Sequence, residues 1–263
     1  MRLDIYLVEN NIIKSRERAK EHIKKGEITV NGCVVLKPAA EINENDDVIF
    51  TGTSLKYVGR GGLKLEKALK CFDIDLNGKV CLDIGASTGG FTDCMLQNGA
   101  SHVYAVDVGH GQLDSTLVAD NRVTNMEKTN VNEVFAESFD IMPEFISADV
   151  SFVSLKNILP KIRELMSDKG SAVVLIKPQF EAGKSNIGKN GIVKDKKVHI
   201  GVLNDIISFC SVVGLYVNKL DYSPISGGDG NIEYLAYITP NQNLSFEISV
   251  KYIVNTAFSE VKK

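Results

Sequence analysis

From residue 80 onward, short apolar segments alternate with longer segments in which apolar positions recur every three or four residues. The first pattern is typical of buried parallel strands, and the second of the helices that cover them. Strands are expected at 80–84, 102–107, 123–126, 145–149, 172–177, 215–223 and 233–238. Helices are expected at 62–72 and near 91–98, 155–166 and 198–213. The pattern predicts a Rossmann-like, doubly wound α/β domain whose seven-stranded sheet is mostly parallel, with a last pair that can run antiparallel.

A smaller unit precedes this domain along the chain. Its expected elements are a short helix that begins at Leu3, a helix over 16–25, and strands at 27–30, 34–36 and 48–50. Ser15 can cap the second helix and Gly26 can end it, while Asn31-Gly32 is a strong hairpin signal. We therefore predict an α+β domain over 1–50, a linker rich in Gly, Ser and Thr over 51–61, and the α/β domain over 62–263.

Basic residues are concentrated in and around the second expected helix. Residues 14–25 contain six lysines and arginines against two glutamates, and three of the basic residues share one helix face. A basic face can simply be solvated, but this helix leads directly into a small strand unit, so phosphate binding explains the charge better. The residues expected to hold RNA phosphates are Arg16, Arg18, Lys20, Lys24, Lys25 and, in the linker, Arg60.

Three short motifs in this unit resemble the S4 RNA-binding domain. They are Arg2-Leu3-Asp4, Ser15-Arg16-Glu17-Arg18-Ala19 and Lys25-Gly26-Glu27-Ile28-Thr29-Val30-Asn31-Gly32. That domain occurs in a ribosomal protein, in pseudouridine synthases and in some rRNA methyltransferases. The resemblance covers nearly all of residues 1–50 and implies an RNA partner.

A glycine-rich turn, Asp83-Ile84-Gly85-Ala86-Ser87-Thr88-Gly89-Gly90-Phe91, follows the first strand of the larger domain. A strand, such a turn and a helix form the entry of a nucleotide-binding unit. Phe91-Thr92-Asp93 stands where a triphosphate-binding loop carries lysine and a hydroxyl. Asp83 would repel a pyrophosphate but suits an ammonium group, and Asp107, 22 residues after Gly85, can accept ribose hydroxyls. These features favour S-adenosylmethionine, with a simple cap and turn as the alternative.

The same reasoning assigns the residues of the cofactor site. The turn is expected at the methionine end, and the segment after the third strand is expected near the adenine. The cofactor-binding residues are predicted to be Asp83, Gly85, Ala86, Ser87, Gly89, Phe91, Asp107 and Asn130.

Four charged residues stand at the ends of elements in the larger domain: Lys64, Asp149, Lys177 and Glu233. A lysine at the end of a buried strand can snorkel to the rim, but strand ends of such sheets converge on the ligand crevice. The four residues resemble the Lys-Asp-Lys-Glu tetrad of FtsJ-type 2′-O-ribose RNA methyltransferases. Together with the S4-like unit, the whole chain is similar to the TlyA family, whose members are named hemolysins and act as rRNA cytidine 2′-O-methyltransferases.

The resemblance implies methyl transfer from S-adenosylmethionine to a ribose 2′-hydroxyl of 16S or 23S rRNA. Neutral Lys177 is the expected base, and Asp149 and Glu233 are expected to orient the two amines. Family members with a helix after the last strand are taken to modify both ribosomal subunits. The segment from Ser245 to Lys263 resembles that helix, so both subunits are expected as partners.

Charge and composition narrow the alternatives. The chain of 263 residues carries a net charge of −3, and its five cysteines are scattered, so neither a disulfide-linked partner nor a metal site is expected. Its start does not read as a signal peptide, and its apolar runs are short of the ~18 residues of a membrane span. We therefore expect a cytoplasmic protein without stable membrane association. The rival readings are a membrane-active cytolysin, a non-catalytic RNA-binding protein and a pseudouridine synthase.

Overall fold

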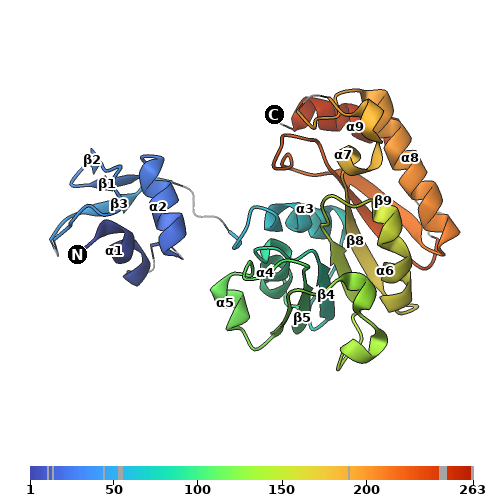
Figure 1. Cartoon of the computed structure of the whole chain (residues 1–263), viewed down its shortest axis with the longest axis horizontal. Helices are drawn as coiled ribbons and strands as arrows, with labels where there is room; N and C mark the ends of the chain where they lie inside the picture. Colours follow the sequence, from blue (N-terminus) through green and yellow to red (C-terminus); the bar gives the residue numbers. More distant parts are fainter. Residues whose placement is uncertain are drawn as a thin grey trace. The chain divides into compact units, whose positions relative to one another are not determined.

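The chain folds into two units, whose helices and strands are labelled in Figure 1. Each unit has hydrophobic core residues of its own. The computed structural model describes residues 1–10, 12–13, 15–43, 45–52, 56–188, 190–242 and 248–261. Its contacts divide it into two units, Met1–Leu55 and Lys56–Lys263.

The first unit packs two helices on a small antiparallel sheet. Its elements are α1 (Leu3–Glu9), α2 (Arg16–Lys24), β1 (Ile28–Val30), β2 (Cys33–Val34) and β3 (Val48–Phe50). The strand order is β2-β1-β3, and Leu7, Ile23 and Ile28 are completely buried between the layers. Ser15 Oγ accepts a hydrogen bond from the backbone N–H of Arg18 at 3.5 Å, as expected of the cap.

The predicted hairpin is confirmed, but its second strand is shorter than expected. Asn31 and Gly32 both have positive φ, at 51° and 77°, which suits the tight turn that joins right-twisted strands. Thr29 pairs with Val34, and β1 begins at Ile28, the residue before Thr29. No residue of β1 is then left to pair with Leu36. Leu36 therefore lies beyond the end of the ladder instead of in the strand predicted over 34–36.

The second unit is built around a seven-stranded sheet. Its strands are β4 (Val80–Ile84), β5 (His102–Val106), β6 (Val123–Met126), β7 (Phe145–Ala148), β8 (Ser171–Ile176), β9 (Tyr216–Tyr222) and β10 (Tyr234–Thr239). Their order in the sheet is β6-β5-β4-β7-β8-β10-β9. The pairs from β6 to β8 are parallel, and β10 runs antiparallel to both of its neighbours. The predicted fold class and the antiparallel pairing of the last two strands are confirmed.

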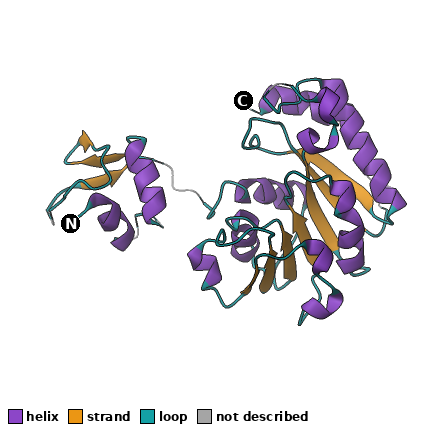
Figure 2. Cartoon of the chain, in the orientation of Figure 1, coloured by secondary structure: helices purple, strands orange, loops and turns teal. Residues whose placement is uncertain are grey.

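Helices cover both faces of this sheet (Figure 2). They are α3 (Gly62–Phe72), α4 (Gly90–Gln97), α5 (Ser115–Val118), α6 (Leu159–Leu165), α7 (Pro178–Glu181), α8 (Lys196–Val212) and α9 (Val250–Glu260). Short 3-10 turns lie at Val131–Glu133, Ala136–Ser138, Leu155–Asn157 and Lys184–Asn186. The core of α3, α4 and α5 includes Cys81, whereas that of α6, α8 and α9 includes Leu82 and Ile84. Alternate residues of β4 thus enter opposite cores, as the pleat requires.

Three predicted boundaries need correction. The helix predicted over 155–166 is divided into a 3-10 turn and α6, since Pro160 favours a new first turn. The predicted linker extends too far, because Tyr57 and Val58 are buried in the second unit. The amphipathic segment predicted from Ser245 becomes helical at Val250, and residues 243–247 and 262–263 lie outside the described residues. No helix within the described parts of the chain is long and apolar enough to cross a membrane.

Candidate active site

The glycine-rich turn joins β4 to α4 and needs its glycines for two different reasons. Gly85 has φ +81°, and a Cβ atom there would lie 2.7 Å from the carbonyl oxygen of Asp149. Only glycine lets the turn pass so close to the end of β7. Gly89 has φ +91°, and a Cβ there would lie 2.2 Å from Leu117 Cδ1. Gly89 therefore allows packing on the core rather than the approach of a ligand.

A cavity of about 850 Å³ opens at the carboxyl ends of β4, β5 and β7. Of the predicted cofactor residues, Gly85, Ser87, Asp107 and Asn130 line it. Apolar side chains form much of the remaining wall: Ile84, Val106, Val131, Val150 and Ile158. Small-molecule sites have this composition, with apolar walls and a few polar groups that orient the ligand.

Asp107 links the glycine turn to the next strand. Its Oδ2 accepts a hydrogen bond from Ser87 N–H, and its Oδ1 accepts one from Gly109 N–H, both at 2.7 Å. Each carboxylate oxygen keeps a second lone pair that can accept a hydroxyl. Asn130 is exposed at the wall, where its side chain accepts a hydrogen bond from Asn132 N–H at 3.0 Å.

Asp83 does not reach the cavity, contrary to the prediction. Because side chains alternate along β4, its carboxylate points into the core beneath α4 and is completely buried. Thr92 Oγ1 and Ser147 Oγ donate hydrogen bonds to it at 2.7 and 2.8 Å. Burial raises the pKa of this carboxyl to about 6, despite those two hydrogen bonds. Asp83 ties β4 to β7 and α4, and Gly89 likewise lies outside the cavity wall.

A smaller cavity of about 240 Å³ adjoins the first and shares Gly85, Ser87, Asp149 and Ser151 with it. Its wall includes three of the four charged residues singled out in the sequence, namely Lys64, Asp149 and Lys177. The predicted residues Ala86, Phe91 and Arg60 also line this second cavity. The carboxylate of Asp149 therefore stands where the two cavities meet.

The four charged residues form a continuous chain of ion pairs. Lys64 Nζ lies 2.7 Å from Glu233 Oε2 and 3.6 Å from Asp149 Oδ2, and Lys177 Nζ lies 2.6 Å from Asp149 Oδ1. None of these four charged side chains exposes more than 19% of its surface. Buried charges of this kind require partners, so alternation of the signs makes the arrangement possible. α3, β7, β8 and β10 carry one residue each, at or next to their ends.

Two residues that were not predicted from the sequence, Ser151 and Gly227, contact these ion pairs. Ser151 Oγ accepts a hydrogen bond from Lys177 Nζ at 2.8 Å. Gly227 lies against Glu233, since a Cβ there would be 2.5 Å from Oε1. Ser151 could have been found from the sequence, because it is a polar residue only two positions after Asp149. The contact between Gly227 and Glu233 has no sequence signature.

Phe152 is the most unusual residue at the mouth of the larger cavity. Its φ is +64°, which a bulky residue rarely adopts, and 90% of its surface is exposed. Its ring centroid lies 5.2 Å from that of Phe180, which is in α7, three residues after Lys177. A strained, exposed aromatic side chain beside a cavity can serve to stack a ligand.

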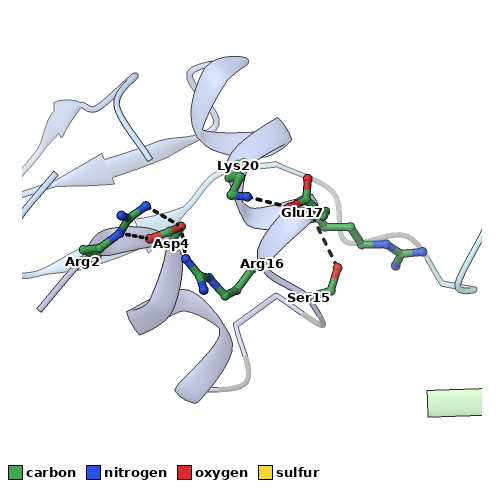
Figure 3. A network of polar contacts seen from close by, with 7 residues as sticks. Arg2, Asp4, Ser15, Arg16, Glu17 and Lys20 are labelled. Atoms are coloured by element: carbon green, nitrogen blue, oxygen red, sulfur yellow. Dashed lines mark hydrogen bonds and ion pairs between the residues drawn. The ribbon is translucent and has the colours of Figure 1, made fainter. Parts of the chain in front are cut away.

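The basic residues predicted to bind RNA have different environments. In the first unit, Arg16 Nη2 lies 3.1 Å from Asp4 Oδ2, and Arg2 donates two hydrogen bonds to the same carboxylate (Figure 3). Lys20 pairs with Glu17 at 2.6 Å. The remaining predicted residues of this unit, of which the lysines are exposed, are Arg18, Lys24 and Lys25. Arg60 belongs to the second unit and lines the smaller cavity.

The Arg2–Asp4–Arg16 cluster was also missed, although Asp4 lies in one of the quoted motifs. Asp4 is completely buried, while Arg2 and Arg16 expose 45% and 51% of their side chains. Hydrogen bonds from Arg2 lower the pKa of Asp4 to about 2. Within the described residues, no group of three or more His, Cys, Asp and Glu side chains is arranged to hold a metal ion.

A mostly parallel sheet with one reversed strand, and a nucleoside-sized cavity at its strand ends, define the Rossmann-like methyltransferase class. A family model described as FtsJ-like methyltransferase matches residues 57–239, and the S4 domain model matches residues 1–48. The chain belongs to the FtsJ-like methyltransferase family, in the branch that carries an S4 domain and includes TlyA. The resemblance noted in the sequence is confirmed.

Several known proteins are similar along most of the chain. YqxC of Bacillus subtilis is 49% identical over 238 residues, which are 90% of this chain and 85% of YqxC. The 16S/23S rRNA (cytidine-2'-O)-methyltransferase TlyA of Mycobacterium tuberculosis is 36% identical over 238 residues, 90% of this chain and 89% of that protein. A solved structure from Streptococcus thermophilus, described as a hemolysin, has 43% identity and a TM-score of 0.77, covering 99% of this chain and 96% of its own.

Proposed function

We propose that this protein transfers the methyl group of S-adenosylmethionine to the 2′-hydroxyl of a cytidine in ribosomal RNA. The observation that carries the proposal is the ion-pair chain Glu233–Lys64–Asp149–Lys177 beside a nucleoside-sized cavity. The activity named for the M. tuberculosis relative supports the choice of substrate. The presence of α9 after the last strand supports modification of both 16S and 23S rRNA.

The larger cavity fits S-adenosylmethionine. Asp107 has lone pairs left for the ribose hydroxyls, and Val106, Val131 and Ile158 offer apolar surface for the adenine. Gly85 and Ser87, which line both cavities, would lie at the methionine end. When bound, the cofactor supplies a methyl group on a positively charged sulfur. The smaller cavity would then receive the ribose.

The ion-pair chain can activate and align the hydroxyl. As a neutral amine, Lys177 would accept the proton of the 2′-hydroxyl while the oxygen takes the methyl group and the methyl–sulfur bond breaks, so that S-adenosylhomocysteine leaves. Asp149, 2.6 Å away, is the nearest carboxylate to that amine, and Ser151 fixes its direction. Lys64, held between Glu233 and Asp149, can donate a hydrogen bond to the ribose oxygen. Most of the rate is expected to come from holding the oxygen in line with the methyl group.

Exposed groups around the cavities suit an RNA substrate. The ring of Phe152 can stack on a base that has left its helix, and the guanidinium of Arg60 can bind a phosphate beside it. The basic side chains of the S4 domain would bind phosphates elsewhere on the same RNA.

The decisive variant is Lys177→Ala. Methyl transfer to ribosomal RNA is expected to fall by at least about 100-fold, because the proton acceptor is lost. Calorimetric affinity for S-adenosylhomocysteine is expected to stay unchanged, and Lys169→Ala, an exposed lysine of the same unit, serves as the control. Near-normal turnover would remove Lys177 from the role of base. Lysis of red cells by purified protein that transfers no methyl group would contradict the proposed function itself.

A further inference from the structure

Glu127 holds together a loop that has no regular structure of its own. Its carboxylate accepts hydrogen bonds from three consecutive backbone N–H groups, those of Gly111, Gln112 and Leu113, at 2.9, 2.8 and 3.1 Å. These bonds, of which the one from Gly111 has the largest effect, lower the pKa of Glu127 to about 2. The group is therefore a carboxylate at any ordinary pH. Consecutive N–H groups that converge on one anion form a nest, here filled by a side chain of the protein.

The clamped loop, residues 108–113, is part of the cofactor site. Val108 and Gln112 line the larger cavity, and Gln112 Oε1 accepts a hydrogen bond from Ser87 Oγ at 3.3 Å. The start of the loop is fixed by Asp107, whose Oδ1 accepts a hydrogen bond from Gly109 N–H. The end of the loop places Leu113 beneath the glycine turn, where its Cδ1 would lie 2.8 Å from a Cβ on Gly89.

The carboxylate itself stands behind the wall rather than in it. Glu127 exposes only 14% of its side chain and does not line the cavity. The ring of His110 lies 3.6 Å from the carboxylate, but it is 69% exposed and so adds little. The backbone bonds from Lys128 N–H to Gly109 and from Thr129 N–H to Asp107 hold the same two segments together. Glu127 is therefore the side chain through which β6 fixes the loop after β5.

We propose that Glu127 is a positioning residue for the cofactor. Its carboxylate keeps loop 108–113 in the conformation that receives the nucleoside, so that binding does not have to order the loop. Preorganisation of this kind raises affinity without adding a contact to the ligand. The proposal rests on the proposed function in that the nucleoside is part of S-adenosylmethionine.

The test uses the full chain and the variant Glu127→Gln, which keeps the size of the side chain and removes its charge. Hydrogen exchange of the peptide covering 108–114 is expected to quicken about tenfold in the ligand-free protein, because charge-assisted hydrogen bonds are lost. The calorimetric Kd of S-adenosylhomocysteine is expected to rise about tenfold, with KM for S-adenosylmethionine rising in parallel and kcat changing less than about twofold. Glu137→Gln, an exposed glutamate of the same unit, is the matched control and should behave as wild type.

The outcomes separate the two hypotheses. Unchanged exchange and affinity in Glu127→Gln would overturn the positioning role, as would a loss of kcat with unchanged affinity. Should Glu127→Gln fail to fold, Glu127→Asp keeps the charge and shortens the reach, and smaller changes of the same sign are expected. Failure of wild-type protein to bind S-adenosylhomocysteine would instead contradict the proposed function, whereas loop exchange in the ligand-free protein would still report on the clamp.

Discussion

Each of the two units places one carboxylate between two cationic side chains, but the surroundings differ. In the methyltransferase unit, Asp149 lies between Lys64 and Lys177, and both lysines are more than 90% buried. In the S4 unit, Asp4 is completely buried, yet its partners Arg2 and Arg16 expose about half of their side chains.

The difference in exposure and in residue type indicates different tasks. A guanidinium keeps its proton and presents a planar fork of donors, so a buried carboxylate behind it can aim it at a phosphate. An ammonium group can lose its proton, and a water-poor site strengthens every charge around it. The S4 cluster thus suits the anion binding proposed for it, and the other cluster suits the proton transfer proposed for Lys177. Three substitutions test this comparison.

The largest effect is expected from Lys177→Arg, which keeps the positive charge but cannot supply a neutral amine. Methyl transfer should fall by at least about 100-fold, which is the lower end of the contribution that a general base makes to a rate. Single-turnover transfer to ribosomal RNA measures it, with S-adenosylhomocysteine affinity as the check on folding. Activity close to wild type would mean that this lysine acts only as a positive charge.

A smaller effect is expected from Asp4→Asn in the S4 unit. The change makes the unit more positive, so a simple charge argument predicts tighter RNA binding. If Asp4 aims the two arginines, affinity should instead weaken about thirtyfold, since ordering each of the two freed side chains costs ~1 kcal/mol. Fluorescence anisotropy with a ribosomal RNA fragment gives the sign, and Asp47→Asn, exposed in the same unit, supplies the charge control. Tighter binding by both variants would refute the positioning of the arginines.

The smallest effect on methyl transfer and RNA binding is expected at Asp83, where the predicted change is in stability. Asp83 is a buried carboxyl with hydroxyl partners in place of cations. Burial raises its pKa from 3.8 to about 6, so folding takes up a proton between these values. The wild-type protein should lose about 3 kcal/mol of stability as pH rises from about 4 to 6, which lowers Tm by roughly 6 °C or more, and the contribution should be constant above that range. Asp83→Asn should lack this part of the pH dependence. Parallel Tm curves for the two proteins would show that Asp83 does not titrate in this way.

Much of the larger unit could be predicted because its information is local. Apolar alternation marked the strands of the sheet, and the turn Gly85–Gly90 with Asp107 located the cavity. Asp149, Lys177 and Glu233 were expected to converge because strand ends of such a sheet share one edge, and the family resemblance added Lys64 to them. The ion pairs between them agree with that expectation.

Other features depended on which chain segments meet. Asp83 precedes the turn as a ligand-binding acid would, but the pleat directs it into the core, against Thr92 and Ser147. Glu127 reads as an ordinary acid after a strand, and only the return of loop 108–113 gives it three N–H donors. A contact between two residues that are distant along the chain leaves no periodic pattern in the sequence. The residues on either side of each partner need not change for the contact to form.

The sequence by itself determined the two-domain order, the strand and helix types, and the edge of the sheet at which chemistry is expected, since propensity, periodicity and glycine geometry act over a few residues. Tertiary structure alone decided which acids line a cavity, which acids are buried supports, and which cations are exposed. Those properties follow from burial and from the partners that packing supplies, and the same aspartate can take any of these roles.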